Sequence, residues 1–215
     1  MRFFFHHFYH SLAWTYDFVA ALISIGRWND WIQSVIPYIQ GTKILEIGHG
    51  TGYLQRTLRE KGVSAIGLDE SAQMIHLAKH RLEKANFKTI NLICGRAQSL
   101  PFLDAKFDTV ISTFPSEYIF DSNTLFDIYR VLREDGHFIV LPAAWIVGHK
   151  ILDRVAAWLF QITGETPRNL IEVVRERFIR PLEQAGFNVE SQQVEIRSSI
   201  VLILVASKNS DINTS

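Results

Sequence analysis

The residues best suited to binding a small ligand stand together in the stretch Lys43–Tyr53. Glu46 lies near the end of a short apolar run, and Gly48, Gly50 and Gly52 follow at every second position. Glycine lets a backbone adopt φ > 0 and approach a ligand closely, while the free N–H groups of a following helix point outward. A carboxylate beside such a turn repels phosphate but attracts an amino group or a sulfonium. The stretch therefore predicts a site for a zwitterion or a cation.

The glycine spacing separates this turn from a dinucleotide-binding turn. That turn follows the pattern G-x-G-x-x-G, which would need a third glycine where Tyr53 stands. Glycines two residues apart also occur in ordinary tight turns. The spacing alone therefore fits both a ligand-binding turn and an ordinary turn. The surrounding elements have to decide between them.

Alternating apolar runs and helical patterns place the turn in an α/β fold. Strands are expected at about 43–47, 64–68, 89–94, 107–113 and 137–141, and helices at about 52–61, from 71 onward and at 122–132. Such alternation is typical of a doubly wound, Rossmann-like parallel sheet with helices on both faces and ligands at the carboxyl ends of its strands. After a helix at about 169–185, the runs 188–197 and 198–207 are expected to form adjacent antiparallel strands, the first at the edge of the sheet.

Two strongly apolar segments accompany this core, one before it and one inserted in it. Residues 1–40 begin with many aromatic side chains, and a helix is expected at about Trp28–Ile39. We therefore expect an N-terminal helical cap over 1–40, a ligand-binding domain over 41–208 with an apolar helical insert at about 143–168, and a flexible tail over 209–215. The early aromatic segment has neither the composition of a signal peptide nor the length of a membrane span.

The order of motifs resembles the class I methyltransferases that depend on S-adenosylmethionine (SAM). Glu46–Gly52 resembles motif I of that family, and Asp69, after the second expected strand, matches motif II. Gly95–Asp108 resembles the block G-D-A-x-x-L-P-F-x-D-x-x-F-D, and Val131–Val140 and Pro181–Val189 follow in the family's order. The similarity is to the branch that includes the ubiquinone and menaquinone C-methyltransferases.

The resemblance implies a seven-stranded, mostly parallel sheet with one antiparallel strand, and SAM as the cofactor with S-adenosylhomocysteine as its product, without a metal. Asp69 would accept hydrogen bonds from the ribose hydroxyls. Arg96 stands where the family has an aspartate that contacts the adenine amino group, and an arginine cannot accept that bond. Adenine would then be held by the backbone near Ala97 and by apolar walls, or stacked under Arg96. The implied cofactor-binding residues are Glu46, Gly48, His49, Gly50, Gly52, Asp69, Glu70, Met74, Arg96, Ala97 and Thr113.

Methyl transfer from a sulfonium is an in-line displacement on an activated donor, so positioning and water exclusion matter more than a dedicated catalytic group. If the acceptor needs a base, the candidates are His149, His137, Tyr9 and His10. Phe5, Trp14, Trp145 and Trp158 are expected to line a pocket for a small, apolar or lipid-like acceptor. The same apolar segments leave three other uses open: they could cover each other, contact a membrane surface, or form a homodimer interface.

Composition narrows the function classes. Lys and Arg total 22, as do Asp and Glu, so the chain lacks the basic excess that nucleic-acid binding uses. The single cysteine, Cys94, excludes an internal disulfide and favours a cytoplasmic location, and no spacing of cysteine and histidine fits a zinc site. Three readings remain: an active methyltransferase of small acceptors, a non-catalytic SAM-binding or scaffolding relative, and, least favoured, a nucleic-acid methyltransferase.

Overall fold

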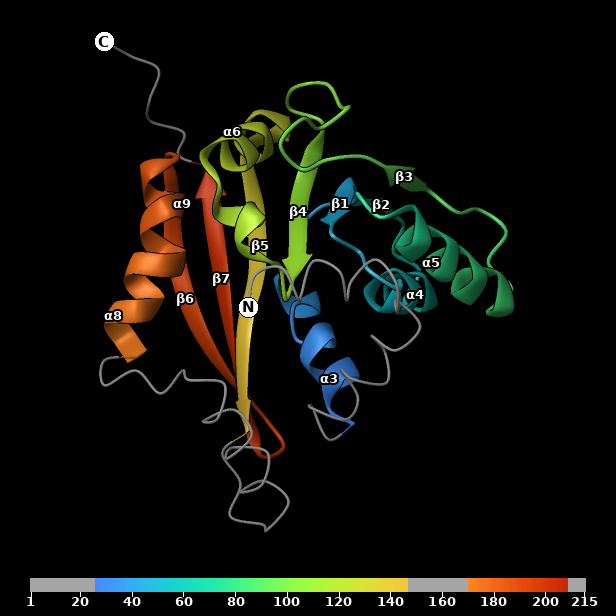
Figure 1. The fold of residues 1–215 in the computed structure, drawn as a ribbon, viewed down its shortest axis with the longest axis horizontal. Coiled ribbons are helices and arrows are strands. Elements are labelled where there is room, and N and C mark those ends of the chain that lie inside the picture. The colour runs from blue at the N-terminus through green and yellow to red at the C-terminus, as the bar shows by residue number, and fades with distance from the viewer. Residues whose placement is uncertain (1–25, 147–169, 209–215) are drawn as a thin grey trace.

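The computed structural model describes residues 26–146 and 170–208, and a seven-stranded sheet forms the centre of this part of the chain (Figure 1). The strand order is β3-β2-β1-β4-β5-β7-β6. The strands are β1 (Ile44–Ile47), β2 (Ala65–Asp69), β3 (Leu92–Cys94), β4 (Phe107–Thr113), β5 (Leu132–Ile146), β6 (Phe187–Ile196) and β7 (Ser199–Lys208).

The direction of the strands confirms the predicted fold. β1 to β5 pair in parallel, and β7 alone runs antiparallel to its two neighbours, β5 and β6. β6 therefore lies at the edge and β7 inside the sheet, as the alternation of their residues indicates. The sequential order reverses at β1, where the chain passes from β3 and β2 on one side to β4 and β5 on the other. In doubly wound sheets this switch point is where ligands bind.

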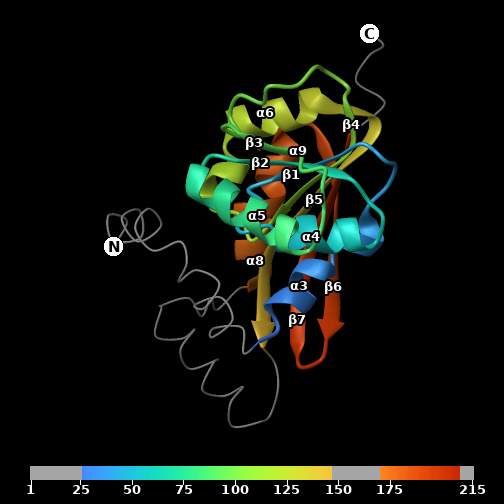
Figure 2. The same ribbon diagram turned by 90° about the vertical axis from the view of Figure 1, so that its right-hand side faces the viewer.

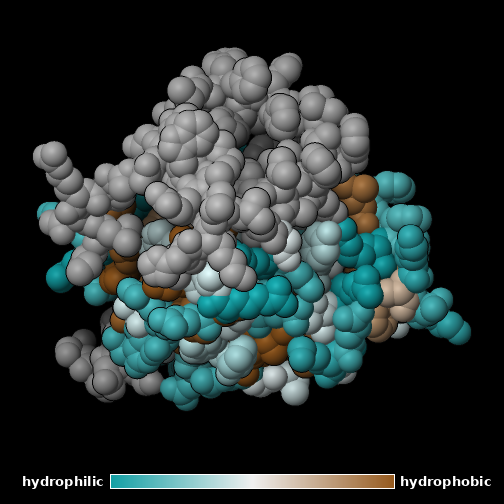
Figure 3. Space-filling model, turned by 90° about the horizontal axis from the view of Figure 1, so that it is seen from below, coloured by the Kyte–Doolittle hydropathy of each residue, from teal (hydrophilic) through white to brown (hydrophobic). Residues whose placement is uncertain are grey.

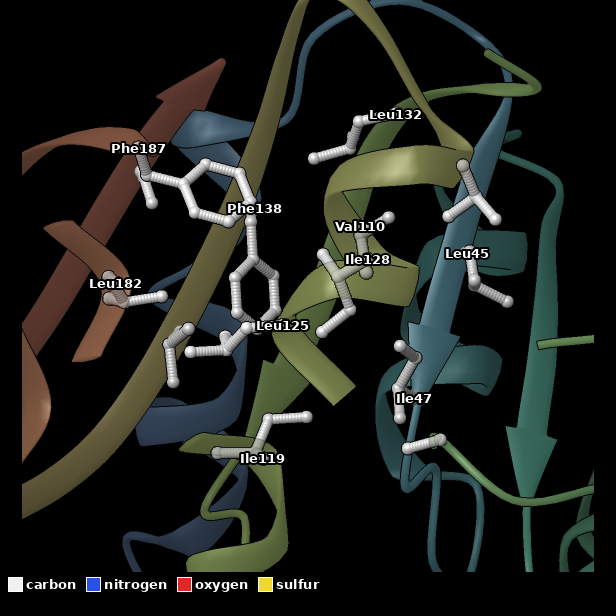
Figure 4. Packing of buried hydrophobic residues seen from close by; sticks show 14 of the residues in the cluster. Leu45, Ile47, Val110, Ile119, Leu125, Ile128, Leu132, Phe138, Leu182 and Phe187 are labelled. Carbon is white, nitrogen blue, oxygen red and sulfur yellow. The ribbon is translucent and has the colours of Figure 1, made fainter. Parts of the chain in front are cut away.

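Helices cover both faces of the sheet. The helical elements are α3 (Trp28–Gln33), η1 (Ile36–Tyr38), α4 (Tyr53–Glu60), α5 (Ala72–Lys84), η2 (Glu117–Phe120), α6 (Ser122–Val131), α8 (Leu170–Val174), the π-helical η3 (Arg175–Ile179) and α9 (Arg180–Gln184). On one face, Leu125 and Ile128 of α6 and Leu182 of α9 pack against Val110 and Phe138 of the sheet (Figure 4).

The opposite face carries a second buried cluster. Trp31 of α3 and Leu54 and Leu58 of α4 pack there against Ile44 of β1 and Ile139 of β5. Neighbouring residues of one strand point to opposite faces, so Ile44 enters this cluster while Leu45 enters the other. The sheet is thus buried on both sides, which explains why its inner strands read as continuous apolar runs.

β5 differs from its expected length. It continues past Pro142 to Ile146, and Ala144, Trp145 and Ile146 pair with Val201, Ile200 and Ser199 of β7. The prediction that a helical insert begins at about residue 143 is therefore wrong for 143–146, and residues 147–168 lie outside the described part. Proline lacks an N–H donor and normally interrupts a ladder, but here it falls within a register shift between Val140 and Ala143.

Two predicted helices are broken in the structure. The helix expected over Trp28–Ile39 consists of α3 and then η1, which includes Pro37. The helix expected at 169–185 contains the π-turn η3 between α8 and α9. β5, β6 and β7 extend beyond the ends of β1 to β4 (Figures 1 and 2). Among the described residues, no helix has the length and hydropathy needed to cross a bilayer.

Candidate active site

A cavity of about 200 Å³ lies at the carboxyl ends of β1, β2 and β4, at the switch point of the sheet. Its walls come from the glycine turn, the start of α5, the loop after β3 and the segment after β4. The lining residues are Ile47, Gly48, Gly50, Leu68, Asp69, Glu70, Ser71, Met74, Gly95, Ala97, Gln98, Thr113, Phe114, Pro115, Ser116 and Tyr118. Seen from the side toward which β4 points, the visible described surface is mostly hydrophilic, with separate hydrophobic spots (Figure 3).

Asp69 connects two elements of the cavity wall through hydrogen bonds. Its Oδ2 accepts a hydrogen bond from the Gly50 N–H at 2.9 Å, and its Oδ1 accepts one from the Ser71 N–H at 2.9 Å. Ser71 in turn caps α5 by accepting a bond from the Met74 N–H, as its residue type predicts. The carboxylate at the end of β2 thus holds the glycine turn of β1 against the first turn of α5.

The glycines are needed for two different reasons. Gly48, Gly50 and Gly52 all have positive φ, which side chains with a Cβ rarely adopt. A Cβ at Gly48 would also lie 2.5 Å from the Tyr118 hydroxyl oxygen, at the cavity wall. Gly52 faces α5 instead, where a Cβ would come within 2.7 Å of the Ala78 Cβ. Gly48 therefore shapes the cavity, and Gly52 permits close packing of two helices.

Glu46 lies beneath the turn and is not among the cavity-lining residues. It is only 1 % exposed and accepts a hydrogen bond from Gln55 Nε2 of α4 at 2.8 Å. Burial raises the pKa of its carboxyl to about 8, against the smaller lowering effect of the Gln55 bond. The carboxyl is therefore mostly protonated at neutral pH, so its binding of a cationic cofactor stays a prediction.

His49 is a third polar side chain in this region, and together with Glu46 and Gln55 it forms a buried polar layer. It is 4 % exposed, and its Nδ1 donates to the Gly50 carbonyl at 2.8 Å. Burial lowers the pKa of the imidazole, although the Asp69 charge acts in the opposite direction. Gly67 of β2 leaves room for this layer, since a Cβ there would lie 2.9 Å from the His49 ring and 3.1 Å from Gln55 Nε2.

The side of the cavity between β2 and β3 is partly apolar. Met74 and Ala97 are buried and line it, together with Glu70. Arg96 does not line the cavity. Its side chain is 67 % exposed, and its Nε lies 3.6 Å from Glu70 Oε1 at the rim. Seven of the predicted cofactor residues thus line the cavity: Gly48, Gly50, Asp69, Glu70, Met74, Ala97 and Thr113.

The sequence motifs predict Thr113 but no other residue of the cavity wall after β4. Phe114 has φ +47 before a proline, a rare combination for an aromatic residue. Its N–H donates to the Leu141 carbonyl at 2.7 Å, and its ring stacks on Trp28 of α3 with centroids 4.4 Å apart. Tyr118 follows on η2. A signal was available, because residues just after a central parallel strand commonly line a ligand site.

Of the predicted base candidates and acceptor residues, the described part of the chain includes His137 and Trp145, and neither lines the cavity. His137 pairs with Thr109, four residues before Thr113 on β4, which is about 13 Å along the strand from the cavity end. This position does not support His137 as a base. Trp145 is half-buried against the same apolar cluster as Tyr118 and Phe178. Tyr9, His10 and His149, and the pocket residues Phe5, Trp14 and Trp158, lie outside the described residues.

Comparisons with known proteins agree with the motif order. Residues 45–140 match a methyltransferase domain. The ubiquinone/menaquinone biosynthesis C-methyltransferase UbiE of Geotalea uraniireducens is 28% identical over 139 residues, which cover 61% of this chain and 59% of the relative. The chain thus spans less than two thirds of that curated relative.

Solved structures share the fold at lower identity. A protein of Methanococcus maripaludis, assigned as a SAM-dependent methyltransferase, superposes with a TM-score of 0.64 at 18% identity, covering 93% of this chain and 94% of that one. A phosphoethanolamine N-methyltransferase of Haemonchus contortus, solved with phosphomonomethylethanolamine and S-adenosylhomocysteine, gives 0.59 at 17% identity, covering 86% and 53%. Residues 45–140 thus match a methyltransferase domain, and the sheet order around the glycine turn is the fold of the class I SAM-dependent methyltransferases.

Proposed function

We propose that this protein moves a methyl group from SAM to a small hydrophobic or lipid-like acceptor and releases S-adenosylhomocysteine. The observation that carries the proposal is the joint placement of the glycine turn and Asp69 around one cavity at the switch point of the sheet. The cofactor would supply an activated methyl group on a sulfonium, so the protein's part is to bind, align and exclude water.

Asp69 is suited to hold the ribose. Each of its carboxylate oxygens accepts one bond from a backbone N–H, from Gly50 and from Ser71. Each oxygen has a second lone pair, and the two can accept bonds from the two ribose hydroxyls. Since the backbone bonds already fix the carboxylate, little side-chain freedom is lost on binding.

The wall between β2 and β3 is suited to adenine. Met74 and Ala97 offer buried apolar surface, and the backbone at Ala97 offers hydrogen bonds to the ring edge. The Glu70–Arg96 ion pair lies at the rim of this side. Arg96 therefore needs no direct contact with adenine, and its departure from the family pattern is compatible with cofactor binding.

The acceptor class rests on one apolar side chain of the cavity wall, on one beyond the cavity on β5, and on relatives. Phe114 lines the cavity, and Trp145 lies half-buried on the extension of β5. The Geotalea relative is named for ubiquinone and menaquinone biosynthesis. The contributions of Phe5, Trp14 and Trp158, the cytoplasmic location, the homodimer and the membrane contact stay predictions. So does the absence of a metal.

The cofactor claim is tested by calorimetric titration with S-adenosylhomocysteine. The wild type should bind at micromolar concentration, whereas NADH should not bind. Asp69→Asn keeps the shape of the side chain but loses the charge, and we expect its affinity to fall about tenfold or more, because hydrogen bonds to a charged group contribute about 1.5–3 kcal/mol each. No binding by the wild type would overturn the proposal and would favour the scaffolding alternative.

The acceptor claim needs a separate test. Turnover of an apolar quinone precursor should fall in Trp145→Ala while S-adenosylhomocysteine affinity stays unchanged. Phe126→Ala is a matched control, since this α6 side chain is 69 % exposed and does not line the cavity. Equal turnover in the wild type and both variants would remove Trp145 from the acceptor site.

A further inference from the structure

Tyr118 occupies a place in the cavity that no sequence motif assigns. It lies on η2, the short helix after β4, and lines the cavity beside the glycine turn. Its hydroxyl oxygen would be 2.5 Å from a Cβ on Gly48, so it lies directly against the first glycine. The phenol oxygen is thereby held at the end of the cavity formed by β1 and β4.

The residues of η2 on either side of Tyr118 contact neighbouring elements or the core. Glu117 pairs with Arg177 of η3 at 3.0 Å, and the Phe120 ring lies 5.3 Å from that of Phe178. Ile119 is fully buried in the core. Immediately after η2, Asp121 caps α6 by accepting a bond from the Asn123 N–H. Tyr118 therefore sits on a preorganised support rather than on a free loop, and that support includes the π-turn η3.

The position of Tyr118 identifies the part of the cofactor that it faces. SAM is a linear molecule with ribose between adenine and the methionine part. If Asp69 of β2 holds the ribose and the β2–β3 wall holds adenine, the methionine part must extend toward β1 and β4. Gly48, Thr113 and Tyr118 line that side. The sulfonium and its methyl group belong to this part.

We propose that Tyr118 is the residue that recognises the transferable methyl group, through its phenol oxygen. The inference rests on the proposed cofactor. The C–H groups next to a sulfonium carry partial positive charge, and an oxygen acceptor attracts them as weak C–H···O hydrogen bonds. Such a contact orients the methyl group for in-line transfer, and it is absent from S-adenosylhomocysteine, which has no methyl group and no sulfonium charge.

The test compares SAM with S-adenosylhomocysteine in calorimetric titrations of the wild type and Tyr118→Phe. Removal of the hydroxyl should weaken SAM about two- to fivefold relative to S-adenosylhomocysteine, the equivalent of one lost C–H···O contact. The methyl proton resonance of bound [methyl-13C]SAM should move upfield in the same variant. Tyr129→Phe is the matched control, because Tyr129 on α6 packs against Phe187, away from the cavity.

Each outcome is decisive. An unchanged affinity ratio with an unchanged methyl resonance overturns the assignment of Tyr118 while leaving the cofactor site intact. An equal loss of both ligands also overturns it, since the hydroxyl would then contact a part that both share. If the wild type binds neither ligand, the proposed function fails and the role of Tyr118 fails with it.

Discussion

Glu46 is the residue whose ionisation should be visible in the stability of the protein. Burial raises its pKa from 4.5 to about 8. The folded state therefore binds a proton that the unfolded state has lost, and the stabilisation is fully present below pH 4.5 and disappears as the pH rises to 8. Between these values the free energy of unfolding should fall by up to about 1.4 kcal/mol per pH unit through this group.

Glu46→Gln isolates that effect. Glutamine keeps an oxygen that can accept the Gln55 bond but does not ionise. We expect wild type and variant to have similar stability near pH 5 and the variant to be more stable by a few kcal/mol at pH 8.5. Urea unfolding at both pH values measures the difference. Parallel pH profiles for the two proteins would show that Glu46 titrates normally in the fold.

Arg96 should matter little for the cofactor, although it replaces a family aspartate. Its side chain is 67 % exposed, and exposed ion pairs contribute only about 0–1 kcal/mol. Arg96→Ala should therefore change the affinity for S-adenosylhomocysteine less than about threefold, whereas Asp69→Ala should abolish tight binding. A tenfold loss in Arg96→Ala would instead place the guanidinium on the ligand, as stacking on adenine would require.

At the scale of elements, the contact between α4 and α5 depends on Gly52. Its φ of +81 disfavours any other residue, and a Cβ would approach the Ala78 Cβ to 2.7 Å. Gly62 has a similar φ of +77 but open space around it. Gly62→Ala should cost about 1 kcal/mol for backbone strain alone, and Gly52→Ala about 1–3 kcal/mol more for overpacking. Equal losses in urea unfolding would show that α5 moves aside at no cost.

The sequence was most informative where one element determines its own form. The apolar runs predicted β1, β2 and β4, and the serine before α5 predicted its cap, because burial on both faces and capping are local requirements. β5 was cut short at Pro142, since the continuation of the strand depends on the ladder with β7. That pairing joins residues about 55 positions apart, and no local pattern reports it.

The site shows the same division. Glycine spacing and Asp69 follow a pattern along the chain, so seven cavity-lining residues were predicted. The wall from Phe114 to Tyr118 was not, because its residues contact Trp28, Leu141 and Arg177 on three distant elements. The motif predicts that His49 and Glu46 bind the cofactor; in the structure both side chains are buried and neither lines the cavity, so their contact with the ligand stays a prediction.

At the scale of the whole molecule, cofactor binding should stabilise the fold. The cavity joins β1, β2 and β4 to the first turn of α5, so a bound ligand holds together elements that separate on unfolding. A ligand that binds only the folded state adds RT ln(1 + [L]/Kd) to the free energy of unfolding, about 2.7 kcal/mol at 100 times Kd. For a chain of 215 residues this corresponds to a rise in Tm of about 5–11 °C.

Thermal unfolding with S-adenosylhomocysteine at 100 times its calorimetric Kd therefore checks the site independently of any acceptor. NADH at the same concentration is the control ligand, and Asp69→Asn at that same S-adenosylhomocysteine concentration should show a smaller shift than the wild type. The stabilisation should follow the logarithm of ligand concentration above Kd, since only the folded state contains the assembled cavity. A Tm that does not respond in the wild type, despite calorimetric binding, would mean that the ligand binds the unfolded chain equally well and that the cavity is not its site.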